Sequence, residues 1–312
     1  MKGLKKLALA TAVAAVPFAA QADLRAMDDS AMGNVTGQAG VTIELETRVS
    51  IGEFRYTDTG AGPKDGGSFA VSGIELGGAG LLTGAAPIFD TDGDGAPDLA
   101  ATQLLDDLAI DIDLNAEGDA LISVHTISGL PIDWAFTADA MTLEGTDSTT
   151  LISGMSAWGF LAQLDITVDT ADKGTGDGSL NIAAAFTVQD MDFDVPFLAV
   201  GIRDMSITGA GTNFDYNGDG VVDAADVDLD GSGTVGDTTA ERINVGFASV
   251  NMDIYKGAGL GASTATDVLR IDVNDIVMDV NVGDVLVGGS TIGSISMDNL
   301  HISNTKLAVY GH

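Results

Sequence analysis

The chain has 312 residues, of which 46 are acidic and 13 basic, so its formal net charge at pH 7 is −33. Nucleic acids and acidic membrane surfaces bind proteins through Lys and Arg, so this charge excludes them as partners and favours divalent cations. Hydrophobic residues make up 45% of the sequence, enough to build a folded core despite the charge. There is no cysteine, which excludes disulfides and zinc–thiolate sites.

The first 22 residues have the layout of a secretory signal peptide. Three lysines within the first six residues precede an apolar, Ala-rich run from Leu7 to Ala20, and the small-x-small triplet Ala20-Gln21-Ala22 follows. The apolar run of about 14 residues is shorter than the roughly 20 that a spanning helix needs. We therefore expect cleavage after Ala22 and export to the cell surface, the extracellular space or the periplasm of a Gram-negative bacterium. No later stretch is apolar enough to predict a transmembrane segment.

Residues 23–40 are predicted to form a short helical or loop segment. Four apolar residues recur there at helical spacing and are followed by a glycine-containing breaker: Leu24, Met27, Ala31 and Val35. The rest of the chain, 41–312, is predicted to be a single β-rich domain with loop insertions at 90–98 and 213–239.

Strand-like alternation begins at Val41. From Val41 to Ile51 apolar and β-branched residues occupy every second position and charged residues lie between them, which predicts a long, half-buried strand. The same alternation returns in four further segments: 108–114, 164–168, 250–254 and 269–273. The sequence therefore predicts an all-β fold, an elongated antiparallel β-sandwich or curled sheet with Asp-rich calcium loops, with a β-solenoid or β-roll as the alternative.

One short pattern recurs four times: an apolar residue, a polar residue, Asp or Asn, then two apolar residues separated by any residue. The copies are Val188–Phe193, Ile202–Ile207, Val273–Met278 and Met297–Ile302. In each, the alternation slips by one residue at the Asp or Asn, which predicts a β-bulge or corner there. The copies are unevenly spaced, whereas a solenoid needs a fixed period.

The loop 215–226 has the spacing of a calcium-binding loop and resembles a dockerin-type EF-hand. The oxygen ligands at positions 1, 3, 5, 7 and 12 are Asp215, Asn217, Asp219, the carbonyl of Val221, and Asp226. Gly220 stands at position 6, where the backbone must turn sharply. The alternative is a solvated Asp-Gly turn.

Two further Asp-rich loops are candidate calcium sites. The first offers Asp228, Asp230 and Ser232, with Thr239 at position 12, so that closure falls to Asp237, Glu241 or a neighbouring loop. The second offers Asp90, Asp92, Asp94 and Asp98, and resembles the aspartate-rich loops of thrombospondin type 3 repeats, in which carboxylates from elsewhere complete the calcium shell. A plain acidic hairpin loop is the alternative for the second loop.

The sequence contains no recognisable catalytic motif. Its three histidines, His125, His301 and His312, stand outside the settings known from hydrolases. His125 and His301 lie within strand-like alternation, so we expect exposed strand positions or side chains with satisfied partners. These observations favour a protein that is not an enzyme.

The segment from Leu24 to Ile43 resembles the mature N-terminus of exported Gram-negative proteins of the FilA-type, pilus-associated family. Its recognisable element is Val35-Thr36-Gly37-Gln38-Ala39-Gly40, and the ending from Ile295 to Ile302 is similar to that group as well. The resemblance implies a cell-surface or fimbrial context and brings no catalytic residues.

Together these observations predict an exported, calcium-binding structural or adhesive surface protein, associated with a pilus or fimbria. Its expected partners are calcium ions and pilus or other cell-surface proteins. Self-association is also expected, because long strands with few prolines leave sheet edges that must be covered or used. Two alternatives stay open: a secreted hydrolase with structural calcium, and a carrier that holds an apolar ligand in a β groove.

Overall fold

The computed structural model describes residues 40–59, 66–90, 96–97, 99–170, 178–211, 221 and 246–311. All of them belong to the unit Gly40–His312. The predicted signal peptide, the predicted helical segment up to residue 39, and most of both loop insertions lie outside the described residues.

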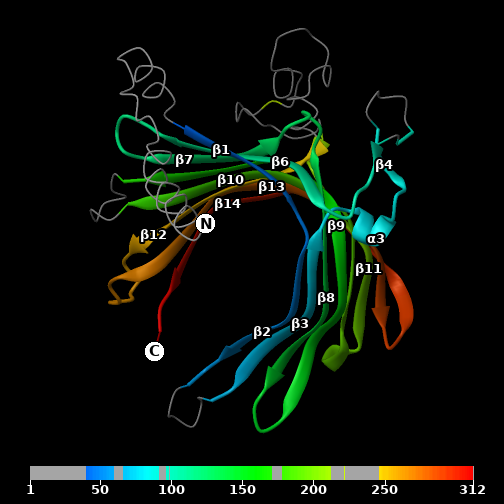
Figure 1. The fold of residues 1–312 in the computed structure, drawn as a ribbon. Helices are drawn as coiled ribbons and strands as arrows, with labels where there is room; N and C mark the ends of the chain where they lie inside the picture. The colour runs from blue at the N-terminus through cyan, green and yellow to red at the C-terminus, as the bar shows by residue number, and fades with distance from the viewer. Residues whose placement is uncertain are drawn as a thin grey trace, which may run out of the picture. The chain divides into compact units, whose positions relative to one another are not determined.

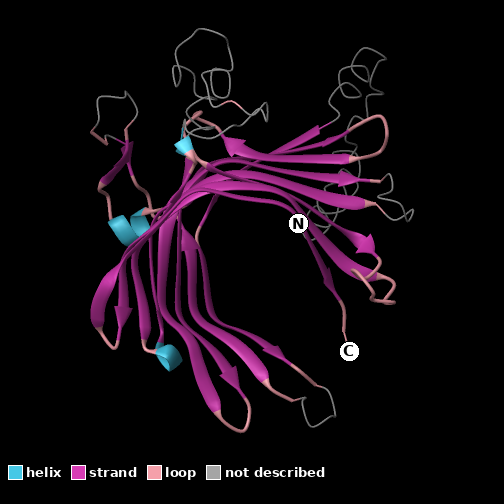
Figure 2. Ribbon diagram, turned by 180° about the vertical axis from the view of Figure 1, so that it is seen from behind, coloured by secondary structure: helices cyan, strands magenta, loops and turns pink. Residues whose placement is uncertain are grey.

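Nearly every described element is a strand (Figure 2). The strands are β1 (Gly40–Thr47), β2 (Val49–Thr57), β3 (Ser68–Gly77), β4 (Pro87–Phe89), β5 (Leu99–Ala100), β6 (Leu105–Leu114), β7 (Ala120–Thr126), β8 (Ile132–Glu144), β9 (Ser148–Asp169), β10 (Ser179–Val195), β11 (Val200–Thr208), β12 (Ala248–Gly257), β13 (Val268–Val287) and β14 (Ser290–Val309). Two short helical turns accompany them, α3 (Gly80–Thr83) and η2 (Pro196–Leu198).

Twelve of these strands form one antiparallel sheet, and β4 and β5 form a separate two-stranded sheet. The prediction of an all-β, antiparallel fold is confirmed. The large sheet is strongly bent (Figure 1), which corresponds to the curled-sheet form of that prediction.

The large sheet has two arms that share four strands. In the first arm the order is β1-β6-β7-β9-β10-β12-β13-β14, and in the second it is β2-β3-β8-β9-β10-β11-β13-β14. Of the shared strands, β9, β10 and β13 pair with different neighbours along their lengths, while β14 pairs with β13 through both arms. In Figure 1, β1, β6 and β7 lie in one part of the sheet while β2, β3 and β8 curve away in the other.

The alternation in the sequence becomes rows of like residues across the first arm. One row is entirely apolar: Ile43, Ile110, Val124, Leu164, Ala184, Val250, Ile276 and Ile302. The next row, on the opposite face, is almost entirely polar: Thr42, Asp111, Ser123, Asp165, Ala183, Asn251, Asp275 and Ser303. Because side chains alternate between faces, the arm has one apolar and one polar surface.

Three of the four predicted slips are β-bulges. The pairing register shifts between Val188 and Asp190 of β10, at Asn274 of β13, and at Asp298–Asn299 of β14. At the fourth, Asp204, the register is kept but the residue takes a left-handed backbone conformation with φ 52°. Bulges bend a strand and increase its twist, so the three bulges help the long shared strands β10, β13 and β14 to curve.

The predicted strand 41–51 forms, but it is not half-buried as expected. It becomes β1 and β2, which lie at one edge of the sheet, and all residues of β2 are exposed. On β1, Val41 and Ile43 are 58% and 43% exposed. An edge strand has a neighbour on one side only, and alternation cannot distinguish an edge strand from a central one.

Gly154 has a left-handed backbone conformation within a strand, and the cost of that conformation for another residue can be tested. Gly154 of β9 has φ 59°, and a Cβ built there meets nothing within 4 Å. Gly154→Ala should therefore lower the free energy of unfolding by about 1–2 kcal/mol through backbone strain alone. Gly52 of β2 also has space for a Cβ but no positive φ. Gly52→Ala is the matched control and should be neutral or slightly stabilising. Equal effects in denaturant unfolding would refute a role for the left-handed conformation.

Candidate metal centre

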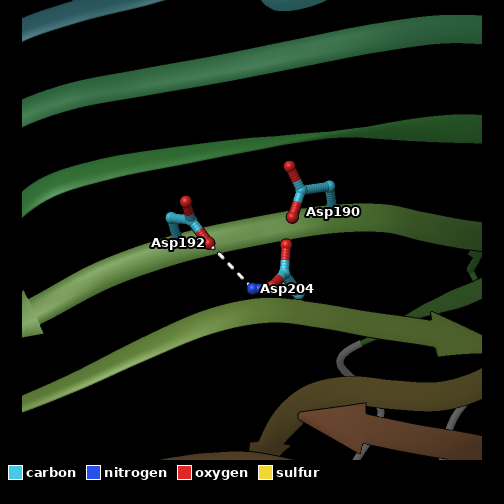
Figure 3. Close-up of side chains that lie close together, drawn as sticks. All are labelled: Asp190, Asp192 and Asp204. Carbon is cyan, nitrogen blue, oxygen red and sulfur yellow. Dashed lines mark hydrogen bonds between the residues drawn. The ribbon is translucent and has the colours of Figure 1, made fainter. Parts of the chain in front are cut away.

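Three aspartates meet where β10 and β11 lie side by side (Figure 3). Asp190 and Asp192 follow the bulge after Val188 and are two residues apart on β10, so both carboxylates project from the same face. Asp204 comes from β11, where its left-handed conformation interrupts the regular strand. Between β10 and β11 the register pairs Val188 with Ile207 and then Phe193 with Ile202, and the cluster lies in the stretch between.

One carboxylate oxygen from each of the three residues lies within 4.8 Å of the other two. The backbone N–H of Asp204 donates a hydrogen bond of 2.9 Å to Oδ1 of Asp192. Oδ1 of Asp190 is buried and has no hydrogen-bond partner among the described residues. A buried, unsatisfied carboxylate oxygen is costly, so the cluster is incomplete in hydrogen-bonding terms.

The surroundings of Asp190 oppose the ionisation of its carboxyl group. Burial raises the pKa of Asp190, and the neighbouring charges of Asp192 and Asp204 raise it further. The nearest basic residue in sequence, Arg203, donates instead to Oδ1 of Asp194 at 2.7 Å and to the carbonyls of Phe193 and Ile202. The three carboxylates thus form a concentrated negative charge.

Such a group suits a hard divalent cation. Calcium takes six to eight oxygen ligands at 2.3–2.6 Å, and carboxylates are its preferred protein ligands. Asp190, Asp192 and Asp204 would supply three of these ligands or more, since a carboxylate binds through one or both oxygens.

Of the ligands predicted from the sequence, only Asp90 and Val221 are described. Asp90 follows β4 directly, and the side chain of Val221 is 55% exposed. The others lie outside the described residues: Asp92, Asp94, Asp98, Asp215, Asn217, Asp219, Asp226, Asp228, Asp230, Ser232 and Asp237. Calcium binding by these loops stays a prediction.

The sequence did not identify Asp190, Asp192 and Asp204 as ligands, although a signal was present. Two of the four slipped patterns, Val188–Phe193 and Ile202–Ile207, contain all three residues. Each pattern predicts a bulge, and neither says which strand lies beside it. Because β10 pairs with β11, the bulge at Asp190 and the left-handed residue Asp204 lie side by side and form one candidate site.

Both described histidines are satisfied partners on strands, as predicted. Nε2 of His125 lies 2.8 Å from Oδ2 of Asp111, and its Nδ1 lies 2.9 Å from the carbonyl oxygen of Thr126. These contacts, that of Thr126 first, raise the pKa of His125. Nε2 of His301 lies 2.6 Å from Oδ1 of Asp275. With both ring nitrogens of His125 engaged, neither is available to activate a nucleophile.

The sequence profile of a family of unknown function, DUF6160, matches residues 1–116. In the described part of the chain the match covers β1 to β6 and stops before the aspartate cluster. No curated protein and no solved structure matches the chain. Within the described residues, the helices are too short and insufficiently apolar to cross a membrane.

The burial of Asp190 and the repulsion from its neighbouring carboxylates predict that the stability of the fold depends on pH. Because its pKa is raised in the fold, Asp190 binds a proton more tightly there than in the unfolded chain. The ionised carboxylate of Asp190 therefore destabilises the fold at neutral pH. This destabilisation is lost as the pH falls through the raised pKa towards the ordinary value of 3.8, because the carboxyl group is then protonated. In chelator at pH 7, Asp190→Asn should unfold at a higher temperature than the parent, and the difference should shrink on acidification.

The matched control for this measurement is Asp147→Asn, in the turn between β8 and β9 and outside the cluster. It should not reproduce the pH-dependent gain. A pH-independent difference for Asp190→Asn, or a loss of stability at pH 7, would contradict this account of the cluster.

Proposed function

We propose that the chain is a non-enzymatic, calcium-binding structural protein of the cell exterior, in which calcium ties neighbouring strands and loops together. The observation that carries the proposal is Asp190, whose carboxylate lies within 4.8 Å of two further carboxylates and whose buried Oδ1 has no hydrogen-bond partner among the described residues. A cation held by the three residues would compensate the carboxylate of Asp190 and remove the repulsion between the three charges.

The location of the cluster between β10 and β11 would allow a bound calcium ion to link these two strands. Between the pairs Val188–Ile207 and Phe193–Ile202, regular pairing of β10 and β11 is interrupted. An ion held by Asp190 and Asp192 from β10 and by Asp204 from β11 would link the two strands where the ladder is interrupted. Binding to the folded state alone then stabilises it.

The donor set and the sequence both favour calcium. The cluster offers oxygen ligands only, and the chain has no cysteine that would favour a softer metal. The predicted loops 90–98 and 215–239 have calcium-type spacing and support the same proposal independently of the cluster.

Export and a surface or adhesive role rest on the sequence. The signal-like segment 1–22 and the resemblance of residues 24–43 to FilA-type proteins support a fimbrial context. A protein in that setting meets calcium at concentrations that suit weak sites.

Thermal unfolding in calcium and in chelator tests the proposal. Extracellular calcium modules bind at roughly 10⁻⁴ to 10⁻³ M, so about 10 mM calcium should stabilise each such site by about 1.4–2.7 kcal/mol. Magnesium demands a tighter octahedral shell and should do less. Asp204→Asn removes the charge but keeps a residue that tolerates φ 52°, and it should reduce the calcium response.

Three further variants separate the cluster from the loops. Asp219→Ala removes a ligand of the predicted loop 215–226, while Asp147→Asn and Asp177→Ala are controls outside both candidate sites. A response lost only in Asp219→Ala would eliminate the cluster as a site but keep calcium binding. No difference between calcium and chelator in the parent would refute the proposal.

A groove at the end of the second arm favours one alternative, the carrier of an apolar ligand. Tyr56, Phe69, Leu143, Leu151 and Phe197 line it, and Tyr56 and Phe197 are 62% and 56% exposed. Apolar walls with a few polar groups are typical of ligand sites.

The alternative predicts binding of an environment-sensitive apolar dye at this groove. Phe197→Asp should weaken dye binding by about tenfold or more, the effect expected from losing a buried aromatic contact. Phe197 lies in η2, and the matched control is the neighbouring exposed Leu198→Asp, outside the residues that line the groove. Equal dye binding by parent and Phe197→Asp would refute the carrier.

A further inference from the structure

Among the described residues, both lateral edges of the large sheet are without a neighbouring strand. β1 pairs only with β6 and β2 only with β3, while β14 pairs only with β13. β1 and β2 together cover residues 40–57 at one edge, and β14 covers residues 290–309 at the other. Each edge therefore presents a long row of backbone groups that can pair with a further strand.

The two edges have opposite polarity. In the first arm, seven antiparallel pairings separate β1 from β14: β1–β6, β6–β7, β7–β9, β9–β10, β10–β12, β12–β13 and β13–β14. An odd number makes β14 antiparallel to β1. The second arm also has seven pairings between β2 and β14. A second copy placed beside the first by translation across the strands would therefore continue the antiparallel sheet.

The two edges also match in length. The row that begins at Ile43 ends at Ile302. The row that begins at Glu53 in the second arm ends at Thr291. These rows are 10 residues apart on the β1–β2 edge (53 − 43) and 11 apart on β14 (302 − 291). The one extra residue of β14 is absorbed at its bulge at Asp298–Asn299, so the two edges can pair along both arms.

Following the rows from edge to edge gives the residues that would face each other. In the first arm the strand pairings place Ile43 opposite Ile302, Thr42 opposite Ser303, Val41 opposite Thr305 and Gly40 opposite Lys306. Ile43 and Ile302 are 43% and 36% exposed, so their contact would bury apolar surface. No like charges oppose each other in these four pairs, and cross-strand pairs of this kind stabilise sheets.

We propose that the partner of this protein is a second copy of the same chain, whose β14 adds to the β1–β2 edge in the row-preserving register. The contact is head to tail, so each added copy presents a fresh edge, and repetition yields a ring or an open fibre. The inference extends the proposed structural role, but its geometry does not involve calcium.

The absence of cysteine allows a direct test by disulfide trapping. Opposite residues in an antiparallel pair have Cα atoms about 4.5–5.5 Å apart, within the range that a disulfide spans. Thr42→Cys and Ser303→Cys chains, mixed and gently oxidised without denaturant, should form a mixed disulfide dimer. Its yield should exceed by about tenfold that of Ser303→Cys mixed with Ile51→Cys, the exposed edge control in the other arm. Ile43→Cys with Ile302→Cys is a second test pair, in case the loss of the Thr42 hydroxyl disturbs the edge.

A chain carrying both Thr42→Cys and Ser303→Cys distinguishes the remaining possibilities. Head-to-tail addition predicts a ladder of linked dimers, trimers and longer species. A link within one chain, dimers formed by either single variant alone, or no preference over the Ile51→Cys control would each overturn the proposal. The trapping should give the same result in calcium and in chelator, because the strand addition does not involve calcium. The calcium proposal is tested separately by thermal unfolding.

Discussion

The structure depends on keeping hydrogen-bonded rows continuous across a sheet that bends. A regular strand cannot curve sharply without losing ladder pairs, and four strands here run through both arms. The chain meets this constraint with bulges at Asp190 and Asn299 and with left-handed residues such as Gly154 and Asp204. Asp and Asn tolerate positive φ better than other side chains, which explains why acidic residues gather at the irregular positions.

The candidate metal centre follows from the same constraint. Where β10 bulges and Asp204 turns left-handed, backbone groups leave the ladder and side chains replace them: the N–H of Asp204 is bound by Asp192. The N–H of Asn299, at φ 56°, is bound by Asp279 at 2.6 Å in the same way. Between β10 and β11 a third carboxylate, that of Asp190, joins the arrangement. At both places an Asp side chain binds the N–H of a left-handed residue. Among the described residues, only between β10 and β11 does a further carboxylate lie close by and concentrate negative charge.

Much of the fold could be predicted from the sequence because alternation is a local property. The strands containing 108–114, 164–168, 250–254 and 269–273 were identified, as were bulges at three of four slips. Pairing is not local, so neither the exposed edge position of β1 nor the meeting of Asp190 with Asp204 followed from alternation. The predicted loop ligands were found from spacing within a single segment, which is why they were proposed while the cross-strand cluster was not.

The four shared strands also determine how the sheet responds to stress. Each of β9, β10 and β13 pairs with a first-arm neighbour along one part and a second-arm neighbour along another, and β14 pairs with β13 through both arms. Neither arm can separate from the other without breaking pairs in both, because the described strands β9, β10, β13 and β14 run continuously through the two arms. The two arms should therefore melt as one cooperative unit, and tension applied at one edge passes through continuous backbone to the other.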